Sequence, residues 1–374
     1  MATFAEYKAA TNTSIQKRIY KIEWMDKDEN IIDEVITDLI SGSVSIQRAN
    51  GVRRSCNVTF ENEDGRFTPD NDGLVYIAKK FKLYSGLIIN GEEAFPPESV
   101  QGVFNLGNPI VKSDSSSNTV TIEGYDNFAL LNGNLAGQID ATTLTISRGQ
   151  LLTDVVKDVL NRGEIIQSPL MDISTQVLPY EITKEAGSTY KDILVELAGV
   201  LAWDIYFNVH GQPVFKPRPD QQNLNHTWLY STTGVSYLGC DHNYNYNDVR
   251  NYIIVYGDNV DGDLSSAIAQ DNGVFSPTSI SRIGKRTLTI EDNLIPTDEI
   301  AQERANYELR QAIEAYEYID LKSINIDFLK EGDIILVDDE EAGISEERFI
   351  VDQINRNLDF NSQMTIKAWK VREI

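Results

Sequence analysis

The residues best placed to do chemistry early in the chain are the carboxylates of an acidic loop, "NVTFENEDGRFTPDND", between Asn57 and Asp72. Three of its acids precede Gly65 and two follow it: Glu61, Glu63, Asp64, Asp70 and Asp72. Such a density is typical of calcium loops, but an EF-hand needs oxygen ligands at positions 1, 3 and 5, Gly at 6 and Glu at 12. With Gly65 sixth, Phe60 stands first and Asn71 twelfth, and Phe cannot ligate. We therefore expect no metal here.

The same loop is well suited to a turn that ends a strand. Asp64 and Gly65 are typical residues for reversing the chain, and Gly65 is expected to adopt a positive φ. Arg66 and Phe67 then return to apolar contact, while Pro69 prevents a helix. We interpret Asp64, Gly65, Arg66, Phe67 and Pro69 as a structural turn motif.

Histidine and cysteine offer little for catalysis or metal binding. His210 lies in the turn "VHGQ", and Cys240 and His242 form "CDH" with His226 upstream. That group lacks the paired spacing of zinc sites, so we do not interpret it as one. Cys56 and Cys240 stand far apart and indicate free thiols in a reducing cytoplasm.

Other chemical signatures are missing from the sequence as well. It contains no G-x-S-x-G, H-E-x-x-H, Walker A or G-x-G-x-x-G pattern. The acidic run Asp338–Glu341 falls between two strand-like segments and is typical of a solvated hairpin tip. We therefore predict no enzyme, no catalytic residue, no cofactor and no bound metal.

Composition narrows the class of protein. The 374 residues are 41% hydrophobic and 24% charged, which is typical of a globular protein of two or three domains. The 57 acidic and 33 basic residues give a net charge of −24, which disfavours tight binding to nucleic acid. No apolar run approaches the length of a membrane span, and the N-terminus shows no signal-peptide pattern.

The elements that must position any site change in type along the chain. Residues 1–145 contain short segments rich in β-branched and aromatic residues, separated by turns, which predict a first small β-barrel domain. Residues 146–220 contain two helical patterns, "GQLLTDVVKDVLNRG" and "STYKDILVELAGVLAWD" with Ser188 as the expected cap, followed by a hairpin. Prolines at 213, 217 and 219 indicate the boundary that follows.

Residues 221–374 return to strands and predict a second β-barrel domain. This part carries the strand "NDVRNYIIVYGD", a polar insertion at 258–284, and a helix at 297–316 with Thr297 as its cap. Two strand–hairpin–strand segments, one around residues 102–126 and the other around 348–370, are weakly similar to one another. The predicted fold is therefore α+β and mainly β, with two barrels around a helix-hairpin module.

The order of these segments resembles a known family. "RRSCNVTFEN" with "DGRFTPDN" and "LYSGLI", then "YKDILVELAGVLAWDIYFNVHGQPVFKP", then "FLKEGDIILVDD" and "RFIVDQINRNLDFNSQMTIKAW", are similar to phage baseplate hub proteins. These belong with the late control protein D family and the N-terminal hub regions of tail-associated lysins. The resemblance spans most of the chain and rests on patterned order. The region 258–284 has no counterpart in it.

The resemblance implies a structural role. Hubs of this family are homotrimers whose two tube-like barrels form a ring that joins the tail tube or distal tail protein to a spike or tip protein. Expected partners also include a tape-measure protein and passing DNA that is not bound specifically, with no membrane contact in the folded form. The expected location is the virion tail, after synthesis in the host bacterial cytoplasm. The chain stops at Ile374 without the C-terminal lytic domain of tail-associated lysins, which weakens a lytic interpretation.

An alternative reading stays open. The chain could be a β-rich carbohydrate-binding protein or a glycoside-processing enzyme, in which exposed aromatic side chains bind sugar rings. Trp228, Tyr244 and Tyr246 are the residues that this alternative would use.

Overall fold

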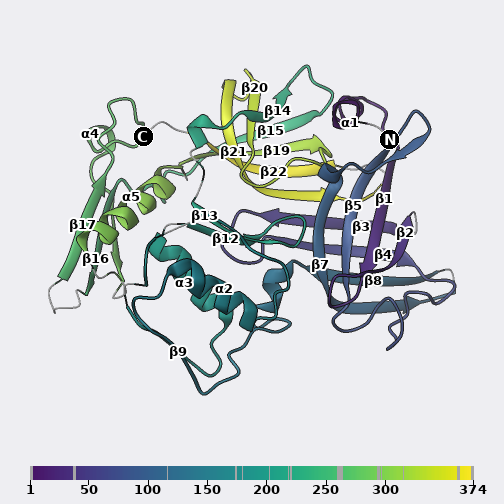
Figure 1. The fold of residues 1–374 in the computed structure, drawn as a ribbon. Helices are drawn as coiled ribbons and strands as arrows, with labels where there is room; N and C mark the ends of the chain where they lie inside the picture. The colour runs from purple at the N-terminus through teal and green to yellow at the C-terminus, as the bar shows by residue number, and fades with distance from the viewer. Residues whose placement is uncertain are drawn as a thin grey trace.

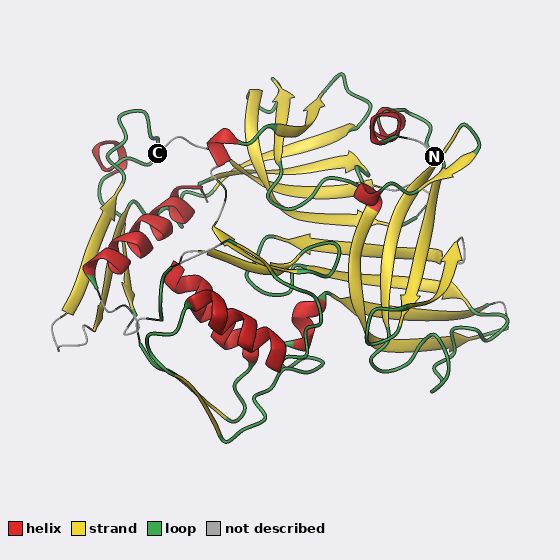
Figure 2. Cartoon of the chain, in the orientation of Figure 1, coloured by secondary structure: helices red, strands yellow, loops and turns green. Residues whose placement is uncertain are grey.

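The structure is a computed structural model of the chain. It describes residues 3–371 apart from 37–38, 116, 173–174, 179, 202, 218, 220, 259–263, 293–294, 296, 315 and 360–362. Within this part no helix is both long enough and apolar enough to cross a membrane. Strand is the commonest secondary structure, and the strands form large, mainly antiparallel sheets (Figure 2).

The N-terminal part consists of one helix and a series of strands. Its elements are α1 (Phe4–Thr11), β1 (Arg18–Met25), β2 (Ile31–Ile36), β3 (Leu39–Gln47), β4 (Arg54–Glu61), β5 (Lys80–Ile89), β6 (Glu92–Ala94), β7 (Val100–Ser113) and β8 (Asn118–Tyr125). Short 3-10 turns lie at Pro97–Ser99 and Asn127–Leu130. In β4 every second residue is buried, so Arg54, Cys56, Val58 and Phe60 share the inner face.

The middle part holds two packed helices and three short pairings. Its elements are β9 (Thr143–Ile146), α2 (Leu152–Arg162), β10 (Leu170–Met171), β11 (Ile182–Glu185), α3 (Tyr190–Leu201), β12 (Trp203–Phe207) and β13 (Pro213–Pro217). Both helices fall where the sequence predicts them. The cap of α3 differs from the expected Ser188: the Asp192 amide donates to Thr189 Oγ1 at 3.3 Å, and Asp192 accepts from the Thr189 amide at 2.8 Å.

The C-terminal part contains a second set of strands and an inserted unit. Its elements are β14 (His226–Ser231), β15 (Tyr237–Tyr244), β16 (Tyr252–Asp258), β17 (Leu264–Gln270), α4 (Ile280–Ile283), β18 (Thr287–Glu291), α5 (Asp298–Glu314), β19 (Glu317–Ile324), β20 (Ile334–Asp339), β21 (Ile344–Asn357) and β22 (Gln363–Lys370). A third 3-10 turn lies at Gln221–Asn223.

Two modules share a five-stranded topology: the strands of the N-terminal part, β1 and β2 included, and those of the C-terminal part other than β16, β17 and β18. In the N-terminal module the strands lie side by side as β3-β4-β8-β7-β5, and in the C-terminal module as β15-β19-β22-β21-β20. Both modules use their strands in the same chain order, and every one of these pairings is antiparallel. The hairpins β7–β8 and β21–β22 occupy equivalent places, and they are the two segments whose similarity the sequence indicated.

The two modules join into one sheet. β21 pairs with β3 from Gln353↔Gln47 to Asn357↔Ser43, so the strand order runs without a break from β15 to β2 (Figure 1). Among the described residues this path is open, and no closed ring of strands is detected. A mainly β fold is confirmed, while the two closed barrels stay a prediction.

One apolar core serves both modules. A single cluster of buried side chains contains Trp24, Phe60 and Phe81 from the first module and Ile319, Phe349 and Ile366 from the second. The middle part has a separate core around Val156, Leu194 and Phe215. The modules therefore share the hydrophobic stabilisation of a single interior.

The segment between β15 and β19 forms a unit of its own. β16, β17 and β18 make a three-stranded sheet, and α5 covers it with a third core that includes Ile253, Ala305 and Leu309. In the first module the equivalent β3–β4 connection is a short loop, so this unit is an insertion into a hairpin. The expected polar excursion at 258–284 contains β17 and α4, which the sequence did not predict, and residues 259–263 of it lie outside the described part.

Candidate functional site at the junction of the two β modules

The loop between β19 and β20, residues 325–333, carries the polar contacts that join the two modules. It leaves the C-terminal module and places Asp327 and Glu331 against strands of the N-terminal module. Both carboxylates are buried. Because a buried charge needs a partner, each of these two carboxylates requires a cationic side chain from the N-terminal module beside it.

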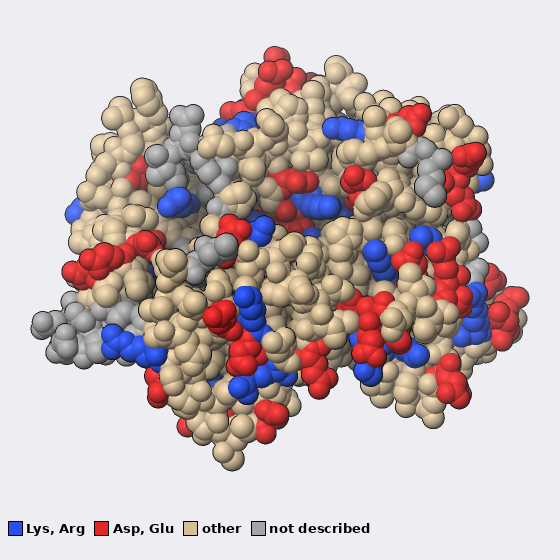
Figure 3. Space-filling model, viewed as in Figure 1, with Lys and Arg blue, Asp and Glu red and all other residues tan. Residues whose placement is uncertain are grey.

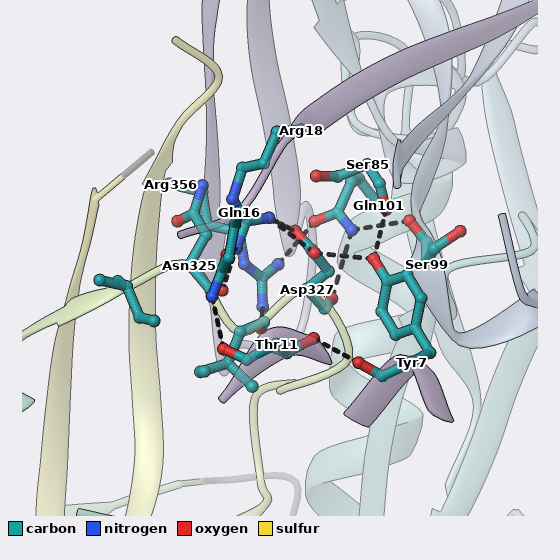
Figure 4. Close-up of polar contacts among 12 residues, drawn as sticks. Tyr7, Thr11, Gln16, Arg18, Ser85, Ser99, Gln101, Asn325, Asp327 and Arg356 are labelled. Atoms are coloured by element: carbon teal, nitrogen blue, oxygen red, sulfur yellow. Dashed lines mark hydrogen bonds and ion pairs between the residues drawn. The ribbon is translucent and has the colours of Figure 1, made fainter. Parts of the chain in front are cut away.

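Asp327 lies at the centre of the first cluster (Figure 4). Arg18 Nη1, at the start of β1, donates to both of its carboxylate oxygens at 2.9 and 2.7 Å. The hydroxyl of Tyr7, on α1, lies 2.8 Å from Oδ2 of the same carboxylate. Burial disfavours the charged guanidinium, but Asp327 outweighs this and raises the pKa of Arg18. Burial first, and then Asp327, raise the pKa of Tyr7 well above its usual value.

Arg356 extends this cluster from β21 to β7. Its Nη1 donates to Gln101 Oε1 at 2.8 Å, and its Nη2 donates to the carbonyls of Ile326 and Leu329. Gln101 Nε2 in turn donates to the Asp327 carbonyl at 3.2 Å. Burial lowers the pKa of Arg356 to about 10. The guanidinium thus holds the loop through carbonyl dipoles, with the Asp327 charge nearby.

Glu331 forms the second cluster. Arg54 Nη2, on β4, lies 2.5 Å from both carboxylate oxygens of Glu331, and Arg54 Nη1 donates to the Phe207 carbonyl at 2.8 Å. Neighbouring Arg53 lies 3.7 Å from Glu331 and 3.3 Å from Asp204. Phe207 and Asp204 belong to β12, so this cluster joins all three parts of the chain.

A third buried carboxylate orients the two arginines. Asp126 accepts hydrogen bonds from the backbone amides of Arg53 and Arg54 at 2.7 and 3.0 Å, and from Phe128 at 3.0 Å. Burial raises its pKa to about 6. Burial also raises the pKa of Asp333, at the end of the junction loop, to about 6.

The polar contacts of this junction hold parts of the chain in position. Its carboxylates are engaged by guanidinium, hydroxyl or amide donors, so each of them holds other parts of the chain in place. Among the described residues no group of three His, Cys, Asp or Glu side chains could hold a metal ion. In both clusters one guanidinium nitrogen contacts both carboxylate oxygens, and these charge-assisted contacts fix the geometry of the elements that carry them.

The turn motif predicted from the sequence lies away from this junction. Gly65 has a φ of +78°, as expected, and the Arg66 amide donates to Asp64 Oδ1 at 2.9 Å. Arg66 Nη2 reaches Asp33 on β2 at 2.7 Å, and Phe67 stacks on Phe60 with ring centroids 4.7 Å apart. The loop is thus pinned to the core of the first module.

Sequence reasoning missed a contributor to this turn. The amide of Phe67 donates to Asn62 Oδ1 at 2.8 Å, and Asn62 Nδ2 donates to Thr68 Oγ1 at 2.9 Å. The available signal was an Asn directly after a strand-like run, since Asn side chains commonly hydrogen-bond the backbone of a following turn.

The aromatic residues of the carbohydrate alternative divide into two groups. Trp228 is only 6% exposed, and its Nε1 donates to Ser236 Oγ at 3.0 Å. The expectation that it offers an exposed surface for a sugar ring is therefore wrong. Tyr244 and Tyr246 are 47% and 61% exposed, and each has its ring centroid within 6 Å of Tyr316. The structure therefore offers a three-tyrosine cluster in place of the expected set.

The histidine considered as a zinc ligand is already engaged. His242 Nε2 lies 2.9 Å from Glu317 Oε1, and Nδ1 lies 2.9 Å from the Ala342 carbonyl. Both ring nitrogens are directed at protein oxygens, so neither faces Cys240 or His226. The acidic run Asp338–Glu341 covers the end of β20 and the turn into β21, as the sequence predicts. It is not solvated throughout: Asp339 is buried and accepts hydrogen bonds from the Tyr237 hydroxyl and the Ala342 amide.

The junction residues themselves were not identified from the sequence. Asp327 and Glu331 sit in a loop, where charged residues are ordinarily solvated. A signal did exist in the strands: Arg54 occupies the inward register with Cys56 and Val58, and Arg356 shares it with Ile354. A charge at an inward position needs a buried partner, but alternation cannot say which one.

Comparison with known proteins gives the fold a context. No protein-family profile and no curated protein sequence matches the chain. Solved structures do match. The tail protein from Neisseria meningitidis is 12% identical, with a TM-score of 0.68 over 94% of this chain and 96% of that one. The 43 kDa tail protein of prophage MuSo2 from Shewanella oneidensis is 15% identical, with a TM-score of 0.64 over 95% and 98%.

A secretion-system protein has the same fold. The Escherichia coli c3393 protein, described as a component of the type VI secretion system with structural similarity to T4 tail proteins gp27 and gp5, is 10% identical. Its TM-score is 0.54 over 90% of this chain and 74% of that one. The structural neighbours of the chain are thus phage tail and tail-related proteins, which agrees with the resemblance found in the sequence.

Proposed function

We propose that the chain is a structural hub of a phage tail or a tail-like particle, joining the tail tube or distal tail protein to a central spike or tip protein. The observation that carries this proposal is the fold match to tail proteins over nearly the whole length of both chains. In this role the protein acts by shape and contact, without catalysis. Its place would be the virion tail, reached after synthesis in the host cytoplasm.

The repeated topology supports a ring-forming arrangement. In this proposal residues 1–145 and 221–374 supply two tube-like barrel domains, and residues 146–220 form the helix-hairpin domain beside them. Two similar modules per chain, in three chains, would present six similar units to a sixfold tail tube. The buried pairs Arg18–Asp327 and Arg54–Glu331 would hold the two modules of each chain at a fixed angle.

The charge balance supports passage of cargo through such a ring. A basic wall would hold DNA through phosphate contacts, whereas a chain with a net charge of −24 repels it. Acidic side chains are spread over the face seen in Figure 3. A tape-measure protein and DNA are therefore proposed to pass through without specific binding.

Sedimentation at two salt concentrations tests the proposal. Like charge on each copy opposes association at low ionic strength, so we expect a monomer–trimer equilibrium that shifts toward trimer as salt rises. Labelled duplex DNA should sediment separately from the protein. A stable dimer, or DNA binding at physiological salt, contradicts the hub proposal.

The three-tyrosine cluster favours a second candidate function. Tyr244, Tyr246 and Tyr316 present neighbouring rings on the surface, which is a geometry that sugar rings can stack on. A glycan-binding screen of the wild type and of Tyr246→Ala tests it. A monomer that binds sugar through Tyr246 would favour a carbohydrate-binding protein over a hub.

A further inference from the structure

The inserted unit ends in a loop that exposes two adjacent apolar side chains. Val274 and Phe275, between β17 and α4, are 76% and 93% exposed. Scattered exposed apolar residues are normal in soluble proteins. An almost fully exposed aromatic ring next to a second exposed apolar side chain instead forms a small apolar patch on the surface. We name Val274 and Phe275 the apolar tip.

The loop behind the apolar tip is rigidly built. Buried Asp271 accepts hydrogen bonds from the Gly273 amide at 3.0 Å, and from the hydroxyls of Ser276 and Thr278 at 2.5 and 2.7 Å. Buried Asn251 donates to the Thr278 carbonyl at 2.8 Å. Because these contacts order the loop in the free protein, insertion of the tip into a partner would cost little conformational entropy.

A basic residue lies against the apolar tip. Arg282, on α4, donates to the Val274 carbonyl at 3.2 Å. Lys285 and Arg286 follow it in sequence, but Lys285 Nζ lies over the Tyr252 ring and Arg286 donates to the Tyr246 carbonyl. Within the described part of the chain none of these three forms an ion pair with a carboxylate. Arg282 therefore places a positive charge beside the tip, on a chain that is strongly acidic overall.

A pocket of about 470 Å³ lies at the other end of the molecule. Its apolar lining includes Phe4 of α1, Ile36 of β2, and the segment Phe95, Pro96 and Pro97 that follows β6. A volume of this size is ample for the side chains of Val274 and Phe275.

The pocket rim is acidic. Among the described residues that line it, Glu34, Glu93 and Glu98 are acidic and Lys21 is the single cation. Lys21 is already paired with Glu23 at 2.8 Å and with Glu34 at 3.3 Å. One oxygen of the Glu98 carboxylate is buried and has no hydrogen-bond partner among the described residues. The rim thus complements the positive charge that Arg282 places beside the apolar tip.

The two features cannot meet within one chain. α4 lies at the left end of the view in Figure 1, and α1 and β2 lie at the right end. A head-to-tail contact between two copies does bring them together. Such heterologous contacts generate rings when the rotation between copies closes.

We propose that the apolar tip of one copy inserts into the Phe4, Ile36, Phe95 and Pro96 pocket of a second copy, with Arg282 facing its glutamates. This inference rests on the proposed ring-forming function and names the surfaces that would form the ring. Phe275 is the anchor of the contact, because aromatic side chains seated in apolar pockets dominate interface energies. The glutamate rim sets the orientation of the partner.

Two single variants of the full chain test the contact by analytical ultracentrifugation. Phe275→Asp removes the tip but keeps the pocket, while Ile36→Arg blocks the pocket but keeps the tip. Each variant alone should associate roughly thirtyfold more weakly than the wild type. Ile77→Asp, which changes another exposed apolar side chain in a loop, is the matched control and should associate normally.

A mixture of the two variants gives the decisive measurement. The Ile36→Arg variant keeps the apolar tip and the Phe275→Asp variant keeps the pocket, so the mixture should form a 1:1 complex. No larger assembly should form, because this complex has neither a second intact tip nor a second open pocket. Circular dichroism confirms that each variant is folded. Arg282→Glu should also weaken association, and Glu93→Lys in the same chain should restore it.

The outcomes separate this contact from the hub proposal. A wild-type trimer that Phe275→Asp leaves intact overturns the contact while the hub proposal stands. A mixture that yields no 1:1 complex also overturns it. A wild type that remains monomeric at all salt and protein concentrations overturns both.

Discussion

The guanidinium of Arg54 lies 2.5 Å from each carboxylate oxygen of Glu331, although 277 positions separate the two residues. Arg54 belongs to the N-terminal module and Glu331 to the junction loop of the C-terminal module. Removing one partner of such a buried pair leaves the other charge desolvated, which costs more than the pair itself contributes. The pair therefore makes the two modules depend on one another.

Glu331→Gln should destabilise the protein by about 3–5 kcal/mol, because it leaves the buried Arg54 guanidinium without its carboxylate, while Arg53 keeps Asp204 at 3.3 Å. The free energy of unfolding in urea measures this. Asp33→Asn is the matched control: its partner Arg66 lies 2.7 Å away, but both side chains are about one-third exposed. We expect a cost of about 0–1 kcal/mol there. Equal effects of the two substitutions would contradict the role of Glu331.

Gly65→Val should destabilise the protein by about 1 kcal/mol or more, because φ at this position is +78°. A Cβ here would meet nothing closer than Thr68 Oγ1 at 3.8 Å, so the cost comes from the backbone alone. Gly65→Asn should be milder, since Asn tolerates a positive φ. A Gly65→Asn variant as unstable as Gly65→Val would instead indicate a steric clash.

Calcium should have no effect on the acidic loop. Its carboxylates are distributed around a turn that is held by Asn62 and Asp64, and it lacks the EF-hand order of ligands. The melting temperature in millimolar calcium should equal that in chelator. A rise of several degrees would restore the calcium interpretation.

Asp333→Asn should change how stability depends on pH. The folded-state pKa of Asp333 is raised to about 6 from an ordinary 3.8, so ionising it in the folded protein costs free energy. The contribution of this carboxyl to the free energy of unfolding is therefore fully present below its unfolded-state pKa. It is lost as pH rises through about 6. Asn does not titrate, so the variant should gain stability relative to wild type between about pH 4 and 7, by roughly 1–3 kcal/mol. Paired melts at several pH values measure the difference, and a constant offset would contradict it.

Purified chain should not degrade bacterial cell wall. The junction carboxylates are held by guanidinium and amide donors, so none is placed as a free acid beside a second free carboxylate. A zymogram with cell wall embedded in the gel measures this directly, with lysozyme as the positive control. A cleared band at the position of the chain would show hydrolase activity.

Local patterns were enough to predict much of the fold. Alternation in β4 places Val58 and Phe60 inward, the 3.6-residue period predicts α2 and α3, and Thr297 caps α5 as expected. These features depend on contacts between residues close in sequence, which is why the sequence displays them. The positive φ of Gly65 belongs to the same class.

Only the tertiary structure decided how the parts meet. The pairing of β3 with β21, the insertion after β15, and the partners of Arg54 and Arg356 all join residues far apart in the chain. Alternation shows that Arg54 points inward, but a carboxylate anywhere among 57 acids could neutralise it. The folded chain selects Glu331 because burial requires a partner and the junction loop brings that one within reach.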